Sequence, residues 1–111
     1  MIFNNEEIIE IENLYGGTGR TKIYKHITEN KIERMKMFAN VTLEAGASIG
    51  YHQHTDDSEI YHIISGSGLF TDADESEKTV TPGDCCVIEK GQSHGIENTG
   101  DCVLEFIAVV F

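Results

Sequence analysis

Apolar and polar residues alternate with a period of two through the middle of this chain, as is typical of β-strands with one buried face. The clearest run places apolar side chains at every second position: Met35, Met37, Ala39, Val41 and Leu43. Residues 59–65, 85–88 and 103–111 are further short apolar segments, and we expect each to be a strand. From residue 34 onward no segment keeps a helical period, so the pattern predicts an all-β fold.

Turn-forming residues separate these segments at intervals of about 8–12 residues. Pro82, Gly83 and Asp84 form the strongest turn signal, and the polar run at residues 72–77 predicts a hairpin loop. Many short strands joined by such turns are typical of a β-sandwich or a closed β-barrel.

The first 33 residues are less regular. Their apolar positions fit either a short helix or a strand: Ile8, Ile9, Ile11 and Leu14. Residues 22–27 fit a strand, and the glycine-rich run at residues 16–19 fits a turn or a hinge, since it lacks the Gly-Lys-Ser/Thr ending of a phosphate-binding loop. We therefore expect one domain over residues 1–111, with an N-terminal arm over 1–33 and a barrel core over 34–111.

The net charge of the chain argues against two classes of binding partner. The chain of 111 residues carries 8 basic and 19 acidic residues, for a net charge of −11. A surface of that sign repels phosphate backbones and anionic lipids, so neither nucleic acid nor a membrane is expected as a partner. The chain shows no secretion-signal pattern, and its apolar runs are shorter than a membrane span. Three cysteines, an odd number, favour buried reduced thiols, and we expect a cytoplasmic protein.

The candidate chemistry lies in four residues. His52 and His54 are two positions apart, so on a strand both imidazoles face the same side. Glu59 follows across a polar stretch and opens the next predicted strand, and His94 lies just after the turn at Gly91. Three imidazoles and one carboxylate suit one divalent transition metal, namely zinc, iron, manganese or nickel, and leave coordination positions for water or substrate. A His-x-His pair alone is also common as surface or core histidines, so the expected site depends on all four residues.

The same residues match the sequence motifs of a known family. The first cupin motif, G-x5-H-x-H-x(3,4)-E-x6-G, is matched by five residues: Gly46, His52, His54, Glu59 and Gly66. The second, G-x5-P-x-G-x2-H-x3-N, is matched by four: Gly83, Gly91, His94 and Asn98. Glu89 replaces the proline of the second motif, which shapes a loop and binds no metal. The chain thus resembles small single-domain microbial cupins.

That resemblance implies a double-stranded β-helix, or jelly roll, with a metal held by His52, His54, Glu59 and His94 inside one mouth of the barrel. It also implies a homodimer in which N-terminal strands extend onto the partner barrel. Small cupins of this kind are similar to isomerases, decarboxylases and dioxygenases that act on small carbonyl, carboxylate or sugar-like molecules. Other cupins are non-catalytic ligand- or metal-binding modules. Because this chain has no room for an output domain, the resemblance favours a metal-dependent enzyme with a small-molecule substrate.

The remaining polar residues assign no reaction class. Tyr61 shares its parity with Glu59, so it either faces the pocket or fills the core. Tyr61 and Glu89 are the only candidates for an acid or base beyond the metal ligands, and the catalytic residues stay unassigned. His62 is three positions beyond Glu59 and is expected to face the other way, whereas His26 lies in the irregular N-terminal region.

Overall fold

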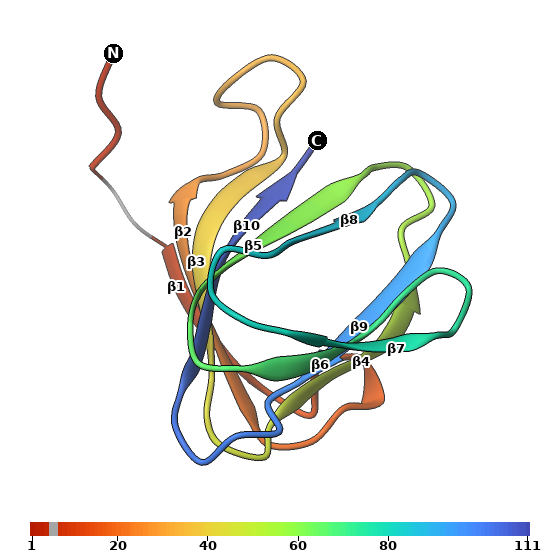
Figure 1. Cartoon of the computed structure of the whole chain (residues 1–111). Coiled ribbons are helices and arrows are strands. Elements are labelled where there is room, and N and C mark those ends of the chain that lie inside the picture. Colours follow the sequence, from red (N-terminus) through yellow and green to blue (C-terminus); the bar gives the residue numbers. More distant parts are fainter. Residues whose placement is uncertain (5–6) are drawn as a thin grey trace.

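The computed structural model describes residues 1–4 and 7–111, and its regular structure is almost wholly β-strand (Figure 1). The strands are β1 (Glu7–Glu12), β2 (Arg20–Ile27), β3 (Met37–Leu43), β4 (Ser48–Gln53), β5 (Glu59–Ser65), β6 (Gly68–Thr71), β7 (Glu77–Val80), β8 (Cys85–Ile88), β9 (Ser93–Glu97) and β10 (Leu104–Val110). One short 3-10 turn, η1 (Leu14–Gly16), joins β1 to β2. Within the described residues, no helix has the length and apolar character needed to cross a bilayer.

The strands form two antiparallel sheets that face each other (Figure 1). The larger sheet has the order β1-β2-β3-β10-β5-β8, and the smaller has the order β4-β9-β6-β7. Neighbours in each sheet are mostly distant in sequence, which is the pattern of a jelly roll rather than of a simple meander. The expected all-β double-stranded β-helix is therefore confirmed.

The core lies between the sheets, and the period-two alternation explains how it forms. On β3 the alternate residues Ala39, Val41 and Leu43 are buried, while Asn40 and Thr42 face the outer side. Large apolar residues of other strands complete this core: Ile49, Ile63, Phe70, Ile88, Ile96, Leu104 and Phe106. Full burial of each large aliphatic or aromatic side chain contributes about 1.5–3 kcal/mol, so this interior is the main source of stability.

The N-terminal residues join the chain's own sheet. β1 pairs with β2 and β2 pairs with β3, so residues 8–11 belong to a strand rather than to a helix. β1 forms one edge of the larger sheet. The division into an arm over residues 1–33 and a core over 34–111 stays a prediction, as does the extension of this arm onto a partner.

The glycine-rich run at residues 16–19 is a close backbone contact with β4. A Cβ atom on Gly17 would lie 2.1 Å from the carbonyl oxygen of Ser48, and one on Gly50 would lie 2.0 Å from that of Tyr15. No side chain fits at such distances, so both positions require glycine. The run therefore fastens η1 against β4, and with it the residues next to the candidate site.

The three cysteines differ in exposure. Cys86 is buried in the core, whereas Cys85 and Cys102 are exposed, and all three are free thiols. Cys85 and Cys86 point to opposite faces of β8, as their adjacent positions predict. The expectation that all three are buried is wrong for two of them, because alternation on β8 sends Cys85 outward and Cys102 lies in a surface loop.

Candidate metal centre

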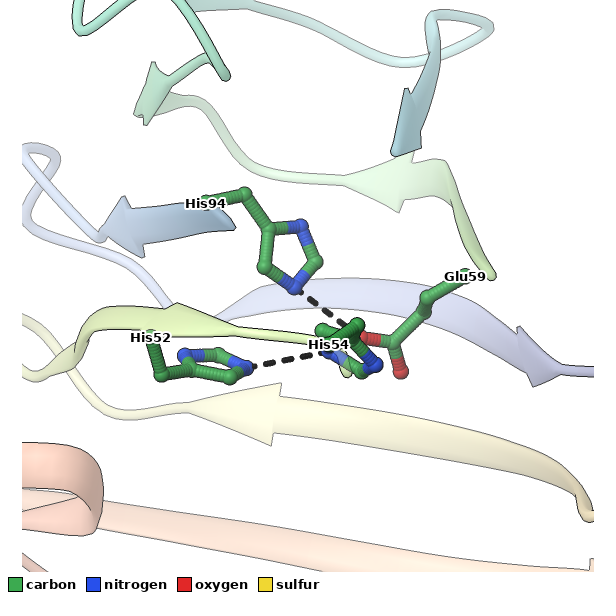
Figure 2. Close-up of side chains that lie close together, drawn as sticks. All are labelled: His52, His54, Glu59 and His94. Atoms are coloured by element: carbon green, nitrogen blue, oxygen red, sulfur yellow. Dashed lines mark hydrogen bonds and ion pairs between the residues drawn. The ribbon is translucent and has the colours of Figure 1, made fainter. Parts of the chain in front are cut away.

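Four side chains from three strands and one loop converge at one point in the barrel (Figure 2). His52 lies on β4, directly opposite His94 on β9, and Glu59 is the first residue of β5. His54 follows the end of β4. One donor atom from each residue lies within 4.8 Å of all the others, so the four can surround a metal ion. The sequence motif thus predicted a set of residues that the fold brings together.

The protonation of His52 and His54 favours a cation between them. Nδ1 of His52 donates a hydrogen bond to the Gly50 carbonyl at 2.7 Å, and Nδ1 of His54 donates one to the Asp57 carboxylate at 2.6 Å. Because these oxygens act as acceptors, each ring carries its proton on Nδ1 and presents a lone pair at Nε2. The two Nε2 atoms lie 3.2 Å apart, so a proton or a metal ion must separate them.

Glu59 and His94 close the other side of the cluster. Oε1 of Glu59 lies 3.1 Å from Nε2 of both His54 and His94. Among the described residues, neither ring nitrogen of His94 has a hydrogen-bond partner, although the ring is 1% exposed. A buried polar atom without a partner is costly, and a metal bound at Nε2 would remove that cost for one nitrogen. The donor set therefore fits a transition metal on both geometry and hydrogen bonding.

Residues next to the four donors hold the rings in place. Tyr15 stacks on His52 with ring centroids 3.9 Å apart, and its backbone adopts the left-handed conformation at φ 52°. Tyr61 stacks on His94 at 4.9 Å. Asp57, which orients His54, is itself bound by Lys36 Nζ at 3.2 Å. Such contacts set the orientation and basicity of histidines that bind metals.

The pKa shifts follow from burial and from these contacts. Burial lowers the pKa of His52, whereas the hydrogen bond with Glu59 raises the pKa of His54. Burial alone would raise the pKa of Glu59, but the close contacts with the His54 and His94 rings outweigh burial and lower it. Glu59 is therefore an ionised carboxylate available to a cation. Burial and the charge of Glu59 raise the pKa of Tyr61 well above its usual value, so that hydroxyl keeps its proton.

A cavity of about 260 Å³ opens onto the cluster from the side of the larger sheet. Its described lining residues are Ile9, Ile11, Leu14, Tyr15, Ile23, Lys25, Met37, Val41, Ile49, His52, His54, Glu59, Tyr61 and Ala108. A space of this size is large enough for several waters or one small organic molecule. The walls are mainly apolar, with polar groups at the cluster and at Lys25.

The structure places three other residues considered from the sequence relative to the cluster. Tyr61 is buried and lines the cavity, so it serves both roles considered from the sequence. His62 faces away from the cluster, with Nδ1 3.3 Å from Cys85 Sγ. His26 also lies outside it, with Nε2 2.8 Å from Asn40 Oδ1.

Four further residues considered from the sequence differ in their position relative to the cavity. Glu89 is exposed and absent from the described cavity lining, which leaves Tyr61 as the remaining acid or base candidate of the two. Met37 lines the cavity, whereas Met35 lines a separate hollow of about 380 Å³ formed mainly by residues 29–36. Asn98 is buried, and its amide nitrogen donates to the carbonyls of Leu43 and Cys102 at 3.0 and 2.8 Å, which is a structural role.

Three residues near the site were not predicted from the sequence: Tyr15, Lys25 and Asp57. Asp57 carried a usable signal, since it lies three positions after His54 in a polar stretch. Tyr15 and Lys25 reach the site only because β1, η1 and β2 fold over the mouth of the barrel. No local pattern in the sequence indicates that arrangement.

Comparison with known proteins agrees with the fold. Residues 39–110 match the model of a family described as the cupin domain. The chain is 35% identical over 113 aligned positions to an oxalate-binding protein of Thermotoga maritima, which covers 99% of this chain and 93% of the relative. The match spans nearly the whole of both proteins, the N-terminal strands included.

Solved structures support the same fold. A crystal structure from Thermotoga maritima, described as a predicted oxalate decarboxylase, superposes with a TM-score of 0.92 at 33% identity and covers 100% of this chain and 98% of that one. The polyketide cyclase RemF from Streptomyces resistomycificus superposes with a TM-score of 0.74 at 19% identity and covers 94% of this chain and 73% of that one. The second similarity, at low identity, reflects the fold alone.

Proposed function

This chain belongs to the cupin family, and from that premise we propose that it binds a small carboxylate of the oxalate type at one divalent transition metal. The metal is held by His52, His54, Glu59 and His94, and zinc, iron, manganese and nickel all suit this donor set. The observation that carries the proposal is the convergence of the four donor atoms within 4.8 Å, with the His52 and His54 Nε2 atoms facing each other.

The cavity supports a small ligand. A space of about 260 Å³ is slightly smaller than typical ligand pockets, which span about 300–1,000 Å³, so it suits a ligand of a few heavy atoms. His52, His54 and Glu59 line it, so a metal held by them would present its open positions to the bound molecule. A bound divalent metal supplies a Lewis acid that attracts and polarises carboxylate oxygens. The sequence match and the structure match from Thermotoga maritima both have descriptions that refer to oxalate, which agrees with this ligand class.

The groups around the cavity favour binding over proton transfer. Beyond the metal donors, the titratable residues in the described lining are Tyr15, Lys25 and Tyr61. The raised pKa of Tyr61 makes it a poor base at neutral pH. A non-catalytic oxalate-binding module is therefore the first candidate. Decarboxylation is the second, because the relative with the TM-score of 0.92 is described as a predicted oxalate decarboxylase. The isomerase and dioxygenase types expected from the sequence have no comparable support.

We also infer a cytoplasmic homodimer. Free thiols at Cys85 and Cys102, both exposed, are typical of a reducing compartment. β1 forms an open edge of the larger sheet, and Ile8 on this strand is 53% exposed. Open edges and exposed apolar side chains are commonly covered by another chain. Sedimentation velocity at micromolar concentration tests the dimer, and a monomer in that experiment contradicts it.

Metal content and oxalate binding test the function together. Protein purified without a tag is analysed by mass spectrometry for metals beside three variants: His52→Ala, His94→Ala and His62→Ala. We expect about one metal per chain in the wild type and in His62→Ala, whose histidine faces away from the cluster. The other two variants should lose the metal. A wild type that takes up no metal after reconstitution with each of the four candidates contradicts the proposal.

Calorimetric titration of the metal-loaded protein with oxalate then tests the ligand. Binding that needs the metal, with no formate or carbon dioxide formed, supports the binding module. Formation of these products at a rate that depends on the metal supports the decarboxylase instead. If metal-loaded protein binds no oxalate, the ligand class is wrong.

A further inference from the structure

β2 carries a lysine on the face that turns toward the barrel interior. Along this strand Thr21 is completely buried, Ile23 packs against the core, and Lys25 lines the cavity. Lys22 and Tyr24, at the intervening positions, face the outer side, where Lys22 Nζ contacts the Tyr24 ring at 5.0 Å. The inward stripe of β2 therefore ends in an ammonium group at a position where the alternation predicts an apolar side chain.

Among residues 1–4 and 7–111, no carboxylate forms an ion pair with Lys25. Ile9, Ile11, Ile23 and Met37 line the same cavity, and apolar walls weaken the solvation of an ammonium ion. Within the described part of the chain, no ion pair involves Lys25, in contrast to Lys22, which pairs with Glu10, and Lys36, which pairs with Asp57. Lys25 is half-buried, so its ammonium group is in part removed from water, and an anion in the cavity would offset that loss of solvation.

Two described carboxylates, one on the neighbouring strand and one in the cavity lining, do not fill this role. Glu7 is the register partner of Lys25 on β1, but its side chain is exposed and forms no ion pair with Lys25 in the structure. Glu59 lines the same cavity, but its Oε1 atom lies 3.1 Å from Nε2 of both His54 and His94. A carboxylate that enters the cavity can therefore pair with Lys25 without competing with an ion pair already formed among the described residues.

We propose that Lys25 is a specificity-determining residue that binds the carboxylate oxygens of a small dicarboxylate at the end that points away from the metal. This inference rests on the proposed function, since it requires a carboxylate already bound at the metal. It narrows the ligand class from small carboxylates in general to dianions. Monoanions that bind the metal equally well should then have a lower affinity for the site, because they lack the second negative charge that Lys25 attracts.

The charges of the site match a dianion. Three neutral imidazoles and the Glu59 carboxylate leave a bound divalent metal with one net positive charge, and Lys25 adds a second. A dicarboxylate neutralises both, whereas a monocarboxylate leaves one charge uncompensated inside an apolar cavity. Lys36 does not enter this balance, because Asp57 already neutralises it at 3.2 Å.

Oxalate and its monoamide, oxamate, provide a matched pair of probes, since they share shape and metal-binding oxygens but differ by one charge. Binding of each is measured by calorimetry on manganese-loaded wild type and on Lys25→Met, Lys25→Arg and Lys22→Met. Lys22→Met removes the same charge from the outer face of the same strand. Metal content of each variant, measured by mass spectrometry, verifies that the site remains intact.

We expect the wild type to bind oxalate about tenfold to a hundredfold more tightly than oxamate, as is typical of a hydrogen bond to a charged group. Lys25→Met should lose this preference by weakening oxalate alone, Lys25→Arg should keep most of it, and Lys22→Met should match the wild type. Equal oxalate affinity in Lys25→Met and wild type overturns the role of Lys25 and leaves the proposed function standing. Absence of binding of both probes to the metal-loaded wild type overturns both proposals.

Discussion

Removal of the Asp57 carboxylate should weaken metal binding without changing any of the four donors. Asp57 accepts the Nδ1 proton of His54 at 2.6 Å, and both side chains are shielded, with exposed fractions of 20% and 13%. Partners of this kind typically contribute a factor of about 10–100 in metal affinity, which corresponds to about 1.4–2.8 kcal/mol. We therefore expect a loss of this size in Asp57→Ala, because His54 loses both its orientation and the negative charge that strengthens its Nε2 donor.

Asp57→Asn separates these two effects. The amide oxygen still accepts the His54 proton but carries no charge, and a charge-assisted hydrogen bond is about twice as strong as a neutral one. Asp57→Asn should then lose about half of the free energy that Asp57→Ala loses. The assay is calorimetric competition between the protein and a chelator of known affinity, with manganese and zinc in turn.

Asp56→Asn is the matched control for this prediction. Asp56 is the exposed neighbour of Asp57, so its substitution removes the same formal charge from the same loop. Metal affinity in Asp56→Asn should stay within about twofold of the wild type, since exposed charges contribute little. If Asp57→Ala binds metal as tightly as Asp56→Asn, the contact with His54 has no role in the site and the reasoning fails.

Three further predictions concern the rest of the molecule. A thiol reagent applied near neutral pH should modify Cys85 and Cys102 rapidly and Cys86 only after unfolding. The reason is that burial raises the pKa of Cys86 to about 12. Rapid modification of all three cysteines in the native protein would contradict the burial of Cys86. Gly50→Ala should lower the free energy of unfolding, measured by thermal denaturation, by about 1–3 kcal/mol, since the alanine Cβ would lie 2.0 Å from the Tyr15 carbonyl oxygen. An unchanged melting temperature would show that η1 moves freely. Metal loading should raise the melting temperature of the wild type but not of the His94→Ala variant, because a ligand that binds only the folded state stabilises it.

Much of the fold could be predicted from the sequence alone. The alternation over residues 35–43 anticipated β3, which begins at Met37, and the segments at 59–65 and 85–88 match β5 and β8. These predictions succeed because side-chain parity on a strand is a local property of the backbone. Residues 22–27 were also expected to form a strand and lie in β2. The conformation of residues 8–11 was left open between helix and strand, because β1 forms by pairing with β2 rather than from a strong pattern of its own.

The four metal-binding candidates were also evident in the sequence, since their types and spacing match the family motifs. Their neighbours were not. Tyr15 over the His52 ring and Lys25 in the cavity depend on how the N-terminal strands close the barrel mouth, a contact between segments far apart in the chain. Local sequence thus determined the strands and the donor set, through backbone periodicity and side-chain chemistry. Only the tertiary structure decided which charges and rings surround that donor set, because long-range strand pairing places them there.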